Sequence, residues 1–115
     1  MTNPQRGEIK IALGDKTYDG RVTLDVVMRI ERQMGKGIVK IAQCMSEADI
    51  STFEVVGIIT PVIKAGGNSV DEKEIGQAVW DAGLAKGIGV CSEILTLALG
   101  AGGDEGNENE AGALL

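Results

Sequence analysis

The chain has 115 residues, a net charge of −6 and 43% hydrophobic residues, but only one Phe, one Tyr and one Trp. This length and composition favour a single domain with an aliphatic core. Histidine is absent and the basic residues form no stripe with interleaved aromatics, so we expect no enzyme, no cofactor, no metal site and no nucleic-acid partner.

The first predicted element is a β-hairpin. Residues 1–7 form a polar lead that we expect to be loose. Apolar and polar residues alternate from Glu8 to Leu13, residues 14–16 are typical of a turn, and alternation resumes from Tyr18 to Val22. This pattern predicts two strands with one wet face. Two strands alone are marginal in water, so the apolar face must pack on the helices that follow.

The stretch from Thr23 to Met45 predicts two helices joined at a corner. Its apolar residues recur at helical spacing, Thr23 is a suitable N-cap, and Gly35 and Gly37 interrupt the pattern. A glycine just past the last periodic residue can take the left-handed conformation that ends a helix.

Glu31 falls inside the apolar arc of the first of these helices. A carboxylate there is costly unless a donor satisfies it, and the free N–H groups at the start of the second helix, around Gly37 and Ile38, are the nearest donors. We therefore predict that Glu31 is a structural clamp on the corner. The alternative is a carboxylate that reaches water at the rim of the apolar face.

Ser51 and Glu54 form a capping box that predicts the start of a third helix, which runs to about Ala65 and ends at Gly66-Gly67. Pro61 lies inside this helix and should kink it. The apolar arc covers nearly half of its circumference. The members of this arc that we select as possible partner contacts are Val55, Ile58 and Val62.

A wide apolar arc has two interpretations. Either the helix is central and buried on several sides, which we favour, or it shares its surface with another chain. Trp80 lies off the core stripe of the following helix. It is either a partly covered rim residue or an anchor in an interface, and we count it with the possible partner contacts.

The C-terminal part predicts two further helices and a tail. Ser69 to Glu72 reads as a second capping box, and that helix ends at Gly83. A last helix extends to about Leu99, with Gly87 and Gly89 weakening its start. Residues 101–115 are acidic and lack hydrophobic period, so we expect them to be disordered.

The cysteines and the hydropathy indicate the compartment. Cys44 and Cys91 lie on apolar faces of separate predicted helices, where buried free thiols are favoured over a disulfide. The opening residues lack a hydrophobic run, and no apolar stretch of roughly 18 residues could span a bilayer. We expect a cytoplasmic protein with no membrane partner.

The predicted fold class is therefore mainly α, with an N-terminal two-stranded β-hairpin packed on about five short helices. Residues 1–7 are the loose lead, residues 8–100 form the single domain and residues 101–115 form the disordered acidic tail. Because no constellation of residues indicates catalysis, we expect a protein that works by contact with other proteins.

Residues 3–100 resemble the gene-transfer-agent type of phage tail assembly chaperone. The order and spacing of short motifs carry the resemblance, whereas Pro61 and the pair Gly87 and Gly89 depart from it. The matching motifs are Asn3-x-x-Arg6-Gly7-Glu8, Gly14, Ile30-Glu31, Gly35-x-Gly37-Ile38, Ile41-Ala42, Ile58-Ile59, Gly66-Gly67, Ala82-Gly83-Leu84 and Ile94-Leu95-x-x-Ala98-Leu99.

The resemblance implies a small helical protein made in the host or producing bacterium. Such a chaperone would bind the tape measure protein and keep it soluble during tail assembly, with tail tube subunits and copies of itself as further partners. One alternative is a structural minor subunit, associated with the tail tube, that stays in the particle. Another is an adaptor unrelated to phage.

Overall fold

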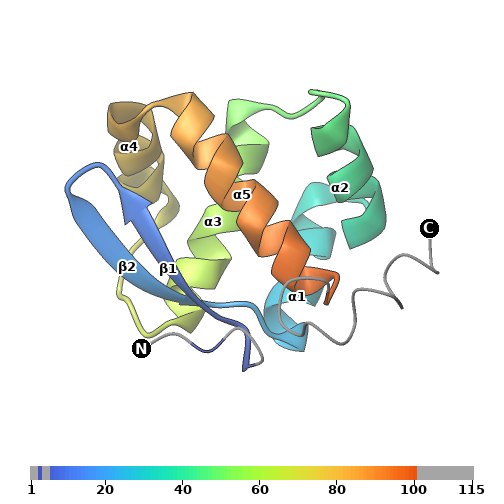
Figure 1. Cartoon of the computed structure of the whole chain (residues 1–115), viewed down its shortest axis with the longest axis horizontal. Coiled ribbons are helices and arrows are strands. Elements are labelled where there is room, and N and C mark those ends of the chain that lie inside the picture. The colour runs from blue at the N-terminus through green and yellow to red at the C-terminus, as the bar shows by residue number, and fades with distance from the viewer. Residues whose placement is uncertain (1–2, 4–5, 101–115) are drawn as a thin grey trace.

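An N-terminal hairpin followed by five helices makes up the computed structural model, which describes residue 3 and residues 6–100 (Figure 1). This arrangement confirms the predicted fold class. The predicted loose lead and disordered tail include residues 1–2, 4–5 and 101–115, which lie outside the described residues. The elements are β1 (Glu8–Leu13), β2 (Lys16–Arg21), α1 (Leu24–Met34), α2 (Ile38–Ser46), α3 (Thr52–Ala65), α4 (Glu72–Ala82) and α5 (Leu84–Ala98).

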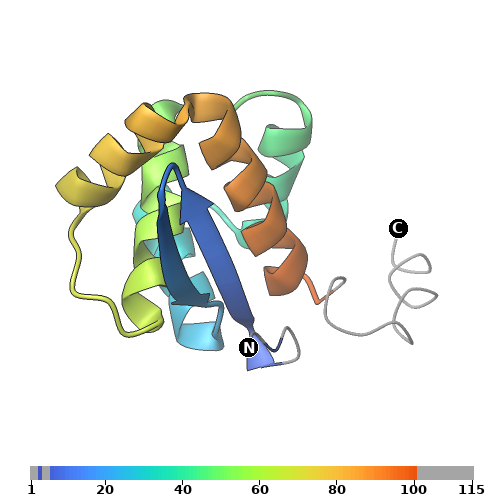
Figure 2. The same cartoon turned by 60° about the vertical axis from the view of Figure 1, so that its left-hand side comes forward.

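The hairpin has one buried face and one wet face. Its strands pair antiparallel, with Leu13 opposite Lys16 and Ile9 opposite Gly20. Every second residue of β1, beginning at Ile9, is buried, and Tyr18 and Gly20 continue this face on β2. Figure 2 shows that no helix lies over the opposite face of the hairpin.

Helix α3 is the centre of the fold. Figure 1 shows α5 and the hairpin in front of it, and α3 contacts α1, α4, α5 and β2. Eight of its residues are buried, from Val55 to Ile63 with one interruption. Helix α3 is apolar on most of its circumference and enclosed on several sides. It is therefore a buried central helix, the interpretation of its wide apolar arc that we favoured.

The caps explain where most of the helices begin. The Thr23 side chain accepts a hydrogen bond from Val26 N, and Ser51 and Glu54 form the predicted reciprocal capping box of α3. The predicted box at Ser69 is wrong, because α4 begins two residues later, where the Asp71 side chain accepts from Glu74 N. Each of these side chains satisfies an N–H group that has no partner within its helix.

The glycines of α5 do not weaken its start. The helix begins at Leu84, before Gly87 and Gly89. A Cβ added at Gly87 would lie 2.9 Å from Val79 Cγ1 and 3.0 Å from Val55 Cγ1. Gly87 therefore lets α5 pack closely against α3 and α4, and its presence in the sequence reflects tertiary packing rather than a helix boundary.

Candidate protein-interaction surface

The three residues of α3 that were selected as partner contacts are fully buried. Val55, Ile58 and Val62 each have 0% exposure. Cys91 of α5 donates to the Val55 carbonyl at 3.5 Å, and Gly20 of β2 lies directly against Val62. The selection of these residues is therefore corrected: α5 and the hairpin already cover this side of α3, and it is not available to another chain.

Trp80 is on the surface, as an interface anchor requires. Its exposed fraction is 69%, and Phe53 on α3 is similarly exposed at 64%. These are two of the three aromatic residues of the chain. Large aromatic side chains are normally at least half covered in a folded monomer. Phe53 was not among the selected contacts, although its place beyond the apolar arc of α3 could have indicated its exposure.

The packing of α3 against α4 brings Phe53 and Trp80 to the same end of the two helices. Glu72, at the start of α4, lines a hollow with Thr60 near the end of α3. One turn along α4, a Cβ on Gly76 would touch the Val56 methyl groups at 3.8 and 3.9 Å. The helices are therefore antiparallel. One further turn in the same direction leads to Trp80 on α4 and to Phe53 on α3.

Three basic side chains lie elsewhere along these helices. Arg29 of α1 and Lys64 of α3 line the hollow of about 360 Å³ at the far end of the α3–α4 contact. Lys73 lies two turns before Trp80 on the same side of α4, where it also borders the hollow next to the hairpin turn. None of these three cations forms an ion pair with a described residue.

Carboxylates are interspersed with these cations. Glu72 Oε2 accepts a hydrogen bond of 2.7 Å from Gln33 Nε2, which links α1 to α4 across α3. Asp81, which follows Trp80 in sequence, accepts from Gln77 and lines the same hollow as Lys73, together with Asp71 and Glu74. Acidic and basic side chains are therefore mixed along this surface.

Glu31 lies at the corner between α1 and α2, where the clamp was predicted. Its Oε2 accepts a hydrogen bond of 2.9 Å from Ile38 N in the first turn of α2. Its backbone carbonyl accepts at 2.8 Å from Gly35 N, and Gly35 has the left-handed conformation (φ 73°) that ends α1. One residue thus contacts both sides of the corner, and its negative charge faces the positive end of the α2 dipole.

Replacing Glu31 by alanine is expected to lower the free energy of unfolding by about 1–2 kcal/mol, because it leaves Ile38 N without its acceptor. Glu31→Gln keeps an acceptor but loses the charge, so its loss should be smaller. Urea denaturation followed by circular dichroism measures the free energy of unfolding of both variants. Glu93→Gln on the exposed side of α5 is the control. An unchanged melting temperature in Glu31→Gln would reject the clamp.

Glu54 connects the start of α3 to the corner. The Ser51 N–H group and the Lys36 ammonium, which lies 3.1 Å from Glu54 Oε2, lower the pKa of this carboxyl below its ordinary value of 4.5. The same carboxylate raises the pKa of Lys36. The charged form of Glu54 is thus favoured in the folded protein, both as a cap and as half of an ion pair.

The lowered pKa of Glu54 predicts a loss of stability in acid. Its contribution is present above the unfolded pKa, near 4.5, and is lost as the pH falls through the lower folded pKa. Melting temperatures measured from pH 6 downwards should therefore fall less steeply in Glu54→Gln than in the parent protein. If the melting temperatures of the two proteins fell equally steeply with pH, Glu54 would contribute nothing to the loss of stability in acid.

The remaining chemistry of the described residues is sparse. Cys44 and Cys91 are buried free thiols, as favoured from the sequence, and burial raises the pKa of Cys91 to about 12. A thiol with such a pKa is a poor nucleophile. Among the described residues, no group of three or more Cys, Asp or Glu side chains could hold a metal ion.

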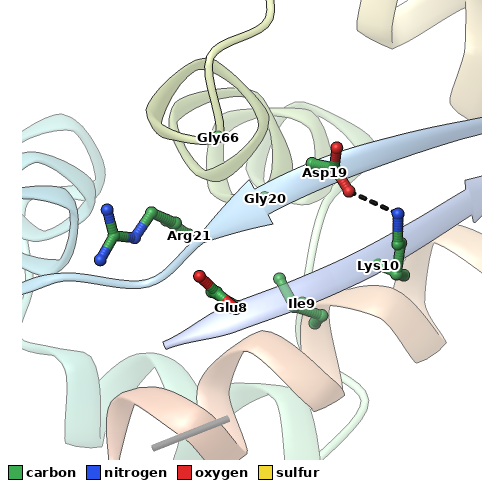
Figure 3. A pocket seen from close by; sticks show the side chains of 7 residues that line it. All are labelled: Glu8, Ile9, Lys10, Asp19, Gly20, Arg21 and Gly66. Carbon is green, nitrogen blue, oxygen red and sulfur yellow. Dashed lines mark ion pairs between the residues drawn. The ribbon is translucent and has the colours of Figure 1, made fainter. Parts of the chain in front are cut away.

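A shallow pocket of about 300 Å³ lies on the wet face of the hairpin, beside the end of α3 (Figure 3). Figure 3 shows the ion pair across it, in which Lys10 Nζ lies 2.7 Å from Asp19 Oδ1. The pair lowers the pKa of Asp19. Both side chains are more than half exposed, so this cross-strand pair is a surface feature of the hairpin and supplies no reactive group.

Comparison with known families identifies the chain. Residues 6–101 match the protein family described as phage tail tube protein, GTA-gp10. The chain belongs to this family. No curated protein and no solved structure matches it.

Membership of the tail tube family confirms one part of the resemblance and corrects another. The gene-transfer-agent and phage tail setting is confirmed. The family is described as a tail tube protein and not as an assembly chaperone, so the description fits the alternative of a tail-tube-associated subunit better. An adaptor unrelated to phage is excluded. No helix among the described residues is long and apolar enough to cross a membrane.

Proposed function

We propose that this protein is a structural subunit associated with the tail tube of a phage or gene-transfer-agent particle. The observation that carries the proposal is the match of the tail tube family across residues 6–101, which includes every helix and strand of the fold. Its partners are then tail tube subunits. It binds them in the cytoplasm of the host or producing bacterium, where tails are assembled. It works by contact and not by catalysis.

The fold supports attachment to a tube more than construction of its wall. A ring closed by a continuous β-sheet needs strands from every subunit that pair on both edges. Within the described residues, the sheet has two strands, and the end of α3 packs against β2, where Asn68 Nδ2 donates to the Asp19 carbonyl at 2.7 Å. Contacts with tube subunits would therefore be made mainly through the helices.

Quantitative mass spectrometry of purified particles tests the proposal. We expect this protein at a constant ratio to the tail tube subunit in independent preparations, and we expect the ratio to survive a high-salt wash. Particles that contain the tube subunit but lack this protein would refute a structural role.

The second candidate is a departing chaperone that binds the tape measure protein. The exposed aromatic pair favours it, because Phe53 and Trp80 are largely exposed and a transient partner would cover them. Absence from particles, together with a tape measure protein that becomes soluble only when the two are co-expressed, would select this function. Abundant copies in the particle would reject it.

A further inference from the structure

The wet face of the hairpin carries two positive and two negative side chains. These are Glu8 and Lys10 of β1 and Asp19 and Arg21 of β2. The strand register places Glu8 directly opposite Arg21. It also places Lys10 directly opposite Asp19. The order of signs along β1 is therefore the reverse of the order at the facing positions of β2, and the four charges sum to zero.

Only one of these two cross-strand pairs is formed within the chain. Lys10 Nζ lies 2.7 Å from Asp19 Oδ1. Neither Glu8 nor Arg21 forms an ion pair with a described residue. In Figure 3 the Arg21 side chain extends away from the Lys10–Asp19 pair. Because no helix lies over this face (Figure 2), a second molecule can reach both unpaired charges.

We propose that the wet face of the hairpin is an interface between two copies of this chain, which pack face to face about a two-fold axis parallel to the strands. The rotation lays β1 of each copy over β2 of the other. Glu8 then meets the partner's Arg21, and Arg21 meets the partner's Glu8. The Lys10–Asp19 pair meets the same pair in reverse order. Every charge of the face thus lies against a charge of opposite sign.

The lengths of the side chains suit this arrangement. Sheets that pack face to face lie about 10 Å apart, and the long side chains of Glu8, Lys10 and Arg21 can bridge that distance from both sides. The third cross-strand position holds Ala12 opposite Thr17. Both of these residues are small and uncharged, so they do not hold the two sheets apart near the hairpin turns.

The balance of signs favours a second copy over a partner of another kind. A surface of one charge, acidic or basic, would bring like charges against half of the face. An apolar surface would take water from Glu8 and Arg21 without supplying a counter-charge. The inference goes beyond the proposed function, because it concerns contact between copies of this chain in solution and not their place in a particle.

Sedimentation equilibrium of the full-length protein tests the interface. We expect a reversible monomer–dimer equilibrium that weakens as the salt concentration rises from about 0.05 M to about 0.5 M, because salt screens exposed charges. Arg21→Glu and Glu8→Arg should each lower the dimer association constant by at least about tenfold, since the symmetry places each repulsive contact in the interface twice. An equimolar mixture of the two variants should associate as the parent protein does, because each altered charge then meets an opposite one.

Two variants with the same changes of charge elsewhere are the matched controls. Lys86→Glu and Glu93→Arg alter exposed positions of α5, and both should leave the association constant unchanged. Trp80→Ala should also leave it unchanged, since the exposed aromatic pair is not part of the proposed interface. Circular dichroism confirms that each variant is folded.

Four results would overturn the inference. They are a parent protein that stays monomeric at low salt, a dimer that survives both charge reversals, a mixture of the two variants that fails to associate, and a dimer that is lost in Trp80→Ala, which would assign the interface to the exposed aromatic pair. The particle composition that tests the proposed function is measured independently. A monomer in solution that is present in particles would leave the structural role standing and reject this dimer.

Discussion

Replacing Gly66 by alanine is expected to lower the free energy of unfolding by about 3 kcal/mol, because the added Cβ would clash with the neighbouring strand. It would overlap the Asp19 carbonyl oxygen and lie 2.8 Å from Gly20 Cα. These are backbone atoms of β2, so no side-chain rotation can relieve the clash. The φ of Gly66 is −79°, which alanine adopts freely, so the whole loss reports the contact between α3 and the hairpin.

Gly89→Ala is the matched control for Gly66→Ala. Gly89 is an exposed position inside α5, and an added Cβ meets nothing within 4 Å. Alanine there should raise the free energy of unfolding by about 0.5–1 kcal/mol, because it restricts the unfolded chain and favours the helix. Urea denaturation of the two variants should give shifts of opposite sign. A Gly66→Ala protein as stable as the parent would show that the hairpin does not pack on α3 as closely as described.

Ile58→Ala is expected to destabilise the isolated protein by about 2–5 kcal/mol. Ile58 has no exposed surface and lies on the central helix, so the truncation leaves a cavity that the surrounding helices can close only in part. For a domain of this size, such a loss lowers the melting temperature by roughly 10 °C or more. Thermal unfolding in the absence of any partner measures it.

Trp80→Ala distinguishes a core residue from a surface residue in the same assay. Because Trp80 is largely exposed, its truncation should change the free energy of unfolding by less than about 0.5 kcal/mol. Ile58→Ala with no effect on the isolated protein would instead mean that this side of α3 is covered only in a complex. The original selection of Ile58 as a partner contact would then be restored.

Local chemistry made much of the fold predictable. The alternation from Glu8 to Leu13 gave the bounds of β1, and the Ser51–Glu54 box gave the first residues of α3. Both signals are short-range, since a strand with one buried face needs a period of two and a helix start needs an acceptor for its first N–H groups. Glu31 was placed by the same reasoning, and it does accept from Ile38 N.

The errors came from choices that only tertiary packing makes. Ser69 and Asp71 are both good N-caps followed three residues later by a glutamate, and local preference does not separate them. The helix begins after Asp71, and it turns Ile75 and Val79 into the core. In the same way, a wide apolar arc shows that α3 is covered, but it does not show whether α5 and the hairpin or another chain provide the cover.

The central position of α3 also has a consequence for synthesis on the ribosome. The hairpin and α1 are made first, but the helix that covers their apolar faces ends only at Ala65. A two-stranded ribbon has little stability of its own. At about 5–20 residues per second, translation leaves the N-terminal segment without its cover for several seconds. The nascent chain is therefore most exposed to misassociation in that interval, before the middle of the sequence leaves the exit tunnel.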